Sequence, residues 1–172
     1  MACIIIISLL VTLLACSIQP LYFSKVAQIA PDMHKRLSSI VIDNPNDHMT
    51  QLVRNQLIFL LSAGSGQPIT PDYQLTLNIR SYVQTSVSID IGDRIEHIGR
   101  PSVGTVTVIS NYILKNSEGK SLAMRKRSVT SSFDRPQQEY ANLTAEENAR
   151  KRAAEELAEQ IFLSLTQDVF HH

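Results

Sequence analysis

The chain has 172 residues, with 16 Lys and Arg balanced by 16 Asp and Glu, and it contains no tryptophan. This length suits one domain of ordinary size, and the neutral charge argues against bulk binding of nucleic acid, which depends on neutralising phosphates. The two cysteines, Cys3 and Cys16, provide no disulfide framework within a domain, so an ordinary aliphatic core must hold the fold together.

The first feature along the chain is an apolar run over residues 1–14 that ends at Leu14-Ala15-Cys16. It is shorter than the about 20 apolar residues of a membrane span and has the length of a signal-peptide core. The Leu-x-Ala-Cys pattern resembles the lipobox of bacterial lipoproteins, whose cysteine is acylated. We predict a lipoprotein signal peptide over residues 1–15 and lipidation of Cys16. The alternative is a buried amino-terminal strand or helix with an inert thiol.

Residues 16–36 are expected to form the lipidated cysteine and a spacer, because this segment has two prolines and no sustained period. A single domain is expected over residues 37–172. It begins with a strand over residues 37–42, which a cluster of turn and cap residues closes. Residues 48–64 then show the apolar stripe of a helix, with Ile58 and Phe59 widening its buried face and Gly64 ending it.

Residues 73–91 give the clearest strand pattern, with apolar residues at alternate positions and polar residues between them. One dry face and one wet face indicate a sheet that is covered on one side. The run is longer than an average strand, so a bulge is expected near residues 81–85. Residues 92–104 are expected to form a loop. Strands over 105–115 and 122–133, joined by a turn at 116–119, complete an antiparallel meander.

A second helix is predicted after Asp134-Arg135-Pro136, which ends the sheet. Thr144 and Glu147 have the spacing of a capping box, and apolar residues then recur every four positions to about Asp168. The order β-α-β-β-β-α predicts an α+β fold. We expect a two-layer sandwich in which two helices pack on one face of a four-stranded, mostly antiparallel sheet.

The sequence lacks the motifs that would indicate an enzyme or a cofactor site. It contains no His-Glu-x-x-His, no Gly-x-Ser-x-Gly and no phosphate-loop pattern. Gly64-Ser65-Gly66 indicates a helix end rather than a dinucleotide site, and the histidines show no ligand spacing apart from the terminal pair. Asp90, Asp93 and Glu96 could hold a hard cation or be solvated loop carboxylates. We predict no catalytic residues, no cofactor and no metal.

Basic side chains gather on the predicted hairpin over residues 115–127, where Glu118 is the only acid. Alternation places Arg125 and Arg127 on one face and Lys126 on the other. Such a patch could bind phosphates by charge-assisted hydrogen bonds, or it could be an edge strand that deters aggregation. Arg80, Arg94 and Arg100 could join it. The candidate phosphate-binding residues are Lys115, Lys120, Arg125, Lys126 and Arg127.

Several short segments, taken in order, carry a resemblance. They are Cys16-x-x-x-Pro20-Leu21-Tyr22, Arg54-Asn55-x-Leu57-x-Phe59-Leu60-Leu61, Tyr73-x-Leu75-x-Leu77, Asp134-Arg135-Pro136-x-Gln138-Glu139-Tyr140-Ala141-Asn142 and Arg152-Ala153-Ala154-x-Glu156-Leu157-Ala158. Together they resemble the lipopolysaccharide-assembly lipoprotein family, LptE, in its alphaproteobacterial form. The resemblance spans essentially the whole chain after the signal peptide.

The resemblance implies an outer-membrane lipoprotein, lipid-anchored on the periplasmic face. Its domain would plug the large outer-membrane lipopolysaccharide-assembly β-barrel of the LptD type, help that barrel to assemble, and aid delivery of lipopolysaccharide to the outer leaflet. Better-studied members bind lipopolysaccharide through basic residues around the strand loops. No family motif transfers this role residue by residue, so the assignment to Arg125, Lys126 and Arg127 rests on their charge. Replacing these three residues together with Ser is expected to weaken lipopolysaccharide binding without unfolding the domain. The alternative is a lipid-anchored auxiliary subunit of an envelope lipid-transport ATPase.

Overall fold

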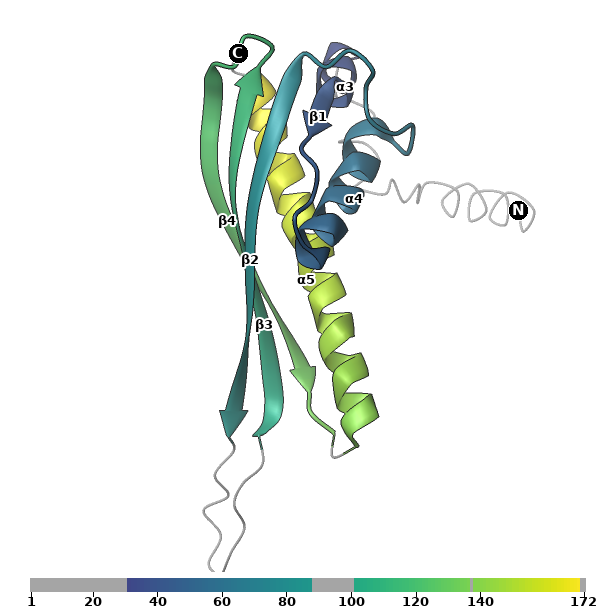
Figure 1. Ribbon diagram of the computed structural model, residues 1–172, viewed down its shortest axis with the longest axis vertical. Helices are drawn as coiled ribbons and strands as arrows, with labels where there is room; N and C mark the ends of the chain where they lie inside the picture. The colour runs from purple at the N-terminus through teal and green to yellow at the C-terminus, as the bar shows by residue number, and fades with distance from the viewer. Residues whose placement is uncertain (1–30, 88–100, 137, 171–172) are drawn as a thin grey trace, which may run out of the picture. The chain divides into compact units, whose positions relative to one another are not determined.

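A computed structural model of the chain describes residues 31–87, 101–136 and 138–170 (Figure 1). Residues Met33–His172 belong to one compact unit, which contains every strand of the sheet. The helices and strands, in chain order, are α3 (Pro31–Ser38), β1 (Ile40–Ile42), α4 (His48–Ser62), β2 (Tyr73–Val87), β3 (Pro101–Asn116), β4 (Ser121–Asp134) and α5 (Glu139–Phe170).

The strands form one four-stranded sheet in the order β1-β2-β3-β4. β1 runs parallel to β2, whereas β2 with β3 and β3 with β4 are antiparallel. Helices α4 and α5 lie on the same side of this sheet (Figure 1). The predicted α+β sandwich, with two helices on one face of a mostly antiparallel sheet, is therefore confirmed.

The core lies between this inner face of the sheet and the two helices. β3 contributes Val106, Val108, Tyr112 and Leu114, which are all fully buried. These residues lie at even-numbered positions along the strand, so their side chains share one face. α5 faces them with small and branched residues, and its alanines allow the helix backbone to come close to the sheet. The fully buried residues of α5 include Ala149, Ala153, Leu157, Ala158, Ile161, Leu165 and Val169.

The amino-terminal part of the fold differs from the prediction. Residues 31–38 form α3 in place of the predicted spacer and strand start, and β1 is only three residues long. Leu37 belongs to α3 and is buried in the core. The hydroxyls of Ser38 and Ser39 donate to the carbonyls of Lys35 and Arg36 at 3.0 and 2.8 Å, which ends the helix before the strand begins.

α4 confirms the helix predicted after the turn cluster, with one correction on its surface. It ends at Ser62, because Ala63 and Gly64 adopt the left-handed conformation with φ of 50° and 90°. Val53 and Leu57 are fully buried, but Phe59 is 59% exposed. A residue two positions beyond Leu57 points to the far side of a helix, so Phe59 does not widen the buried face.

The long strand β2 pairs with β3 without the predicted bulge at residues 81–85. The register is continuous from Tyr73 opposite Asn116 to Ser86 opposite Val103, and it shifts only between Ser86 and Val87. β3 begins at Pro101, so residues 101–104 are strand and not loop. A partner strand of similar length lets the pair absorb its twist gradually. Residues 88–100 of the predicted strand end and loop lie outside the described residues.

α5 begins five residues earlier than the predicted capping box. Glu139 is its first residue, and the backbone N–H of Asn142 already donates to the carbonyl of Gln138 at 3.0 Å. Thr144 lies inside the helix, where its hydroxyl donates to the carbonyl of Tyr140 at 2.9 Å. The capping-box prediction is therefore wrong, because α5 begins at Glu139 and Thr144 lies within the helix.

Asp47 caps the N-terminus of α4, and this cap is expected to make the stability of the fold depend on pH in the acid range. Its carboxylate accepts from the N–H and the hydroxyl of Thr50 at 2.9 and 2.8 Å. The hydrogen bond from the Thr50 N–H lowers the pKa of Asp47 below its ordinary value of 3.8. Because the folded-state pKa is depressed, this stabilisation is present above about pH 4 and is lost as the pH falls through the folded pKa.

Asp47→Ala is expected to lower the free energy of unfolding by about 1 kcal/mol at pH 7, since it removes the N-cap acceptor. Chemical denaturation at pH 7 and at pH 3 would measure this. The difference between wild type and variant should shrink at the lower pH. Asp47→Asn retains an acceptor and is the matched control, and equal stability of Asp47→Ala and wild type would contradict the capping role.

Candidate functional site

The predicted basic residues all lie on the hairpin formed by β3 and β4. Lys115 is near the end of β3, and Lys120 precedes β4 in an exposed turn. The turn is fixed by Asn116, whose side-chain oxygen accepts from the N–H groups of Glu118 and Lys120 at 3.1 and 2.8 Å. Gly119 supplies the positive φ of 80° that the turn requires. The predicted turn is confirmed.

Arg125 and Arg127 point to the helix-covered face of the sheet, as the alternation predicts. The guanidinium of Arg125 donates to the carboxylate of Asp168 through Nε at 3.0 Å and through Nη2 at 2.5 Å. Arg127 donates from Nη2 to the hydroxyl of Ser164 at 2.7 Å. Both arginines therefore hold the carboxyl-terminal part of α5 against β4.

Asp168 is the centre of this contact. Its side chain is only 3% exposed, and a carboxylate buried to this extent needs hydrogen-bond donors. Tyr112, from the carboxyl-terminal half of β3, donates its hydroxyl to the other carboxylate oxygen at 3.2 Å. Burial raises the pKa of the Tyr112 phenol, and the nearby carboxylate acts in the same direction. The hydrogen bond to Asp168 raises the pKa of Arg125.

The sequence pattern did not identify Asp168 or Ser164 as partners of the basic residues. A signal was nevertheless present. Arg125 and Arg127 occupy the same alternating positions as the buried residues Val129 and Phe133, so their side chains had to meet the helix layer. Charged groups on a covered face usually have partners, and partners had to come from the helix above.

Lys126 lies between Arg125 and Arg127 in β4, so its side chain points to the opposite, outer face of the sheet. No described helix covers that face (Figure 1). Because directly paired residues in an antiparallel sheet share a face, the register defines this outer face residue by residue. Its members are Gln74, Thr76, Asn78, Arg80, Tyr82, Gln84 and Ser86 of β2; Val103, Thr105, Thr107, Ile109, Asn111, Ile113 and Lys115 of β3; and Met124, Lys126, Ser128, Thr130, Ser132 and Asp134 of β4.

The outer face is polar and cationic. Arg80, Lys115 and Lys126 contribute three positive charges, against one acid of this register, Asp134 at the end of β4. The carboxylate of Asp43 also reaches this face, where it accepts from the side chains of Gln74 and Thr76 at 2.7 Å. Arg80 lies in the register row next to that of Lys126, two strands away, which places their Cα atoms roughly 12 Å apart. The predicted patch is thus divided between two faces, and Arg80 joins its outer half. Arg94 and Arg100 lie outside the described residues.

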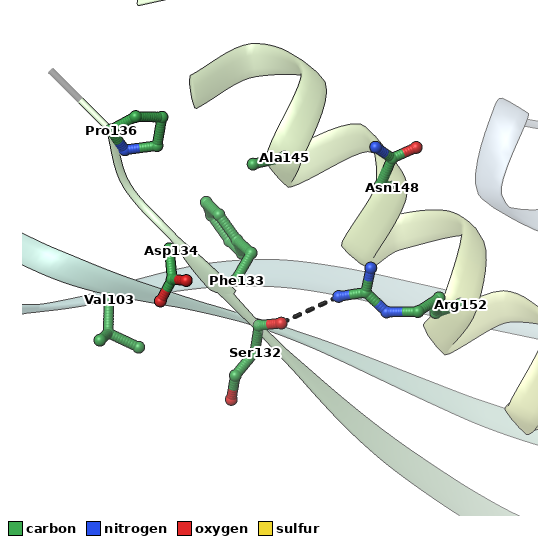
Figure 2. Close-up of a pocket in the computed structure, with 8 residues that line it drawn as sticks. All are labelled: Val103, Ser132, Phe133, Asp134, Pro136, Ala145, Asn148 and Arg152. Atoms are coloured by element: carbon green, nitrogen blue, oxygen red, sulfur yellow. Dashed lines mark hydrogen bonds between the residues drawn. The ribbon is translucent and has the colours of Figure 1, made fainter. Parts of the chain in front are cut away.

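Two hollows lined by described residues border the sheet. One, of about 530 Å³, lies at the end of β4 beside the start of α5 (Figure 2). There the guanidinium of Arg152 donates to the carbonyl of Ser132 at 2.9 Å. Its lining residues are Val103, Ser132, Phe133, Asp134, Pro136, Ala145, Asn148 and Arg152. The second, of about 560 Å³, lies between β2, α5 and the first residues of α4.

The described residues contain no group of three or more His, Cys, Asp or Glu side chains that could hold a metal ion. Asp90, Asp93 and Glu96, the predicted candidates for a cation, fall outside the described part of the chain. No helix within residues 31–87, 101–136 and 138–170 is both long and apolar enough to cross a membrane.

Two arginines from the segments that carry the family resemblance, Arg54 and Arg135, form hydrogen bonds within the domain. Arg54 donates to the carbonyl of Asp43 at 3.0 Å and to the side chain of Gln67 at 3.3 Å, which joins α4 to the end of β1. Arg135 donates to the side chain of Asn142 at 3.3 Å and so joins the residue after β4 to the first turn of α5. These two arginines therefore hold the fold together at its connections.

Comparison with solved structures shows the same fold. A candidate lipoprotein from Caulobacter crescentus superposes with a TM-score of 0.62 at 22% identity, over 79% of this chain and 94% of that one. Rare lipoprotein B from Shewanella oneidensis gives 0.54 at 16% identity, over 77% and 97%. A minor lipoprotein from Acinetobacter baumannii gives 0.53 at 13% identity, over 75% and 89%. A sequence comparison with curated proteins gives no match.

The family comparison matches residues 35–165 to the lipopolysaccharide-assembly family LptE. The match begins in α3 and ends in α5, so it spans α4, most of α5 and every strand of the sheet. The chain therefore belongs to the LptE family of lipopolysaccharide-assembly lipoproteins.

Proposed function

We propose that this protein is an outer-membrane lipoprotein that plugs the lipopolysaccharide translocon barrel, assists its assembly and aids delivery of lipopolysaccharide to the outer leaflet. The observation that carries the proposal is the family match over residues 35–165. The outer face adds physical support, because a plug must offer polar side chains to the polar interior of an outer-membrane barrel. Thr107 and Thr130 already pair their hydroxyls across this face at 3.1 Å.

Affinity purification tests this proposal. Full-length tagged protein is extracted from envelopes in detergent, and its partners are identified by mass spectrometry. A large outer-membrane barrel in about equal amount is the expected result. An inner-membrane ATPase complex in its place would overturn the plug and favour an auxiliary subunit of a lipid transporter.

The proposal places the anchor on Cys16, outside the described residues. Cys16→Ala is expected to abolish acylation, because the substitution removes the thiol that would carry the lipid, and to release the protein from the membrane fraction. Two or three acyl chains hold a protein on a bilayer, whereas none leaves only the weak contacts of the domain. Metabolic labelling with a fatty-acid analogue measures the change, and Ser17→Ala serves as control. A labelled band that persists in Cys16→Ala would refute the anchor.

Within this function, we assign contact with lipopolysaccharide phosphates to the lysines of the hairpin, Lys115, Lys120 and Lys126, with Arg80 beside them. Arg125 and Arg127 bind α5, so replacing them also removes contacts within the domain. The combined replacement of Arg125, Lys126 and Arg127 by Ser is therefore expected to lower stability, contrary to the expectation from sequence. A test of binding should leave both arginines intact.

Lys115→Ser with Lys126→Ser is expected to weaken lipopolysaccharide binding roughly fivefold at low salt, at about 0.5 kcal/mol for each surface contact. Lys35→Ser with Lys151→Ser is the matched control, since both pairs remove the same charge and both control residues are exposed. Fluorescence titration at two salt concentrations measures the affinities. Equal weakening of lipopolysaccharide binding by the two pairs would show general electrostatic attraction. Unchanged binding in Lys115→Ser with Lys126→Ser would show that the lysines of the hairpin do not contact lipopolysaccharide and serve instead to deter aggregation at the sheet edge.

A further inference from the structure

The two edges of the sheet differ in how they are covered. β4 forms one edge along its whole length. On the other edge, β1 lies beside β2 only at Tyr73–Leu75. Beyond Leu75, the described part of the chain places no strand next to β2 on this side (Figure 1). Residues Leu77–Thr85 of β2 thus form a second edge of the sheet, which we call the β2 edge.

Two hydrogen bonds show which backbone groups of β2 point to this edge. The carbonyl of Leu75 accepts from the N–H of Asp43 on the β1 side at 3.1 Å. The carbonyl of Gln84 accepts from the hydroxyl of Thr105 on the β3 side at 3.5 Å. Backbone groups of alternate residues point to opposite sides of a strand, so odd-numbered residues face the edge. They are Leu77, Ile79, Ser81, Val83 and Thr85.

At the β4 edge, hydrogen bonds from arginine side chains discourage pairing with another strand. The carbonyl of Lys126 accepts from Arg127 Nη1 at 3.1 Å, and that of Ser132 accepts from Arg152 Nη2 at 2.9 Å. By the same alternation, both carbonyls belong to even-numbered residues whose backbone groups point outward. Guanidinium groups therefore occupy part of this edge, and positive charge surrounds it, as in protected natural edges.

Within the described residues, no side chain donates to an outward carbonyl of the β2 edge. Its sequence, Leu77–Thr85, contains one charged residue, Arg80, and neither proline nor glycine, while β-branched and aromatic residues are frequent. Natural proteins seldom leave such an edge open unless another strand pairs with it. The composition of the β2 edge is typical of an edge strand to which another strand adds.

Space is available beside this edge. The hollow of about 560 Å³ is bordered on one side by Ile79, Arg80 and Ser81 of β2. Asp47, His48 and Met49 at the start of α4 and Arg150 of α5 complete its lining. The side chains of Leu77, Ile79 and Val83 on the inner face are only partly buried, so an added strand would cover them further.

We propose that the β2 edge, defined as Leu77–Thr85, binds an extended segment of the barrel protein, which adds a strand to the sheet. This inference rests on the proposed function. The chemistry of the edge specifies the segment: alternating side chains, apolar next to Ile79 and Val83 and polar on the outer face. Arg80 is exposed and forms no ion pair with a described residue, so it favours a carboxylate opposite it.

Ser81→Pro tests the edge directly. Proline removes the outward N–H of Ser81 and places its ring where an added strand would lie, whereas pairing of β2 with β3 does not use that N–H. Ser128→Pro is the matched control, because it makes the same change at an outward position of the β4 edge. Both tagged full-length variants are purified from envelopes with wild type, the barrel is quantified, and thermal unfolding is measured.

Recovery of the barrel is expected to fall about tenfold or more in Ser81→Pro and to remain near wild type in Ser128→Pro. A photo-crosslinking amino acid at position 81, compared with one at position 128, provides a second measurement that does not depend on tolerance of proline. It should capture the barrel from position 81 only.

Wild-type recovery of the barrel by a folded Ser81→Pro variant, or crosslinks from position 81 to a second copy of this chain, would overturn the inference alone. So would an absence of crosslinks from position 81 in a chain that retains the barrel. Failure of wild type to recover any barrel would instead overturn the proposed function, and with it the named source of the strand.

Discussion

Asp168→Ala is expected to lower the free energy of unfolding by about 2 kcal/mol, because it leaves the buried hydroxyl of Tyr112 without its acceptor. The substitution also releases Arg125 of β4 from α5, so the carboxyl-terminal turns of the helix lose a contact with the sheet. Urea denaturation at pH 7, followed by circular dichroism, measures the loss. A loss below about 0.5 kcal/mol, the usual range for a surface substitution, would show that Asp168 does not hold the helix.

Two further variants separate the contributions at this position. Asp168→Asn retains an oxygen for Tyr112 but removes the negative charge, so its stability should lie between those of wild type and Asp168→Ala. Gln167→Ala is the matched surface control, because Gln167 is the neighbouring residue of α5 and its side chain is exposed. It should change stability by less than about 0.5 kcal/mol.

The raised pKa of Tyr112 also predicts an alkaline limit. Burial favours its neutral form in the folded state, whereas the unfolded chain ionises near pH 10. The folded-state pKa is the higher one, so the stabilisation is complete below pH 10 and declines as the pH rises through the folded pKa. Tyr112→Phe should show a weaker decline over this range.

Gly104→Ala is expected to cost about 2 kcal/mol by overpacking. Gly104 lies opposite Phe133 in the register, and a Cβ at this position would be 2.6 Å from Cε1 of the phenyl ring. The ring would have to move into the neighbouring hollow of about 530 Å³ that it lines, and its burial would be lost (Figure 2). Thermal unfolding measures the effect.

A double-mutant cycle with Phe133→Leu identifies the cause. If the ring is the obstacle, Gly104→Ala should cost clearly less in the Phe133→Leu background, where no ring opposes the new methyl group. An equal cost in both backgrounds would place the effect in the backbone of β3 instead. Gly66→Ala is not a suitable control, because its φ of 89° imposes a separate strain.

At the basic hairpin, the sequence predicted the faces on which the basic side chains lie but not the partners of the arginines. Alternation correctly separated Arg125 and Arg127 from Lys126, because the period of a strand is a local property. Sequence could not show that Asp168, 43 residues later, neutralises Arg125. The approach of α5 to β4 depends on the packing of the whole helix, which no local pattern encodes.

The sequence by itself determined the α+β class, the helix α4, the three long strands and the polar outer face, because apolar periodicity acts over a few residues. The tertiary structure decided the start of α5, the helical form of residues 31–38, the continuous register of β2 over residues 73–86 and the unequal edges of the sheet. Each of these depends on partners distant in sequence. The length of β2 depends on its pairing with β3, and the position of Leu37 in α3 depends on its burial in the core. The hydrogen bond from Arg152 to Ser132 of β4 forms only when α5 packs on the sheet.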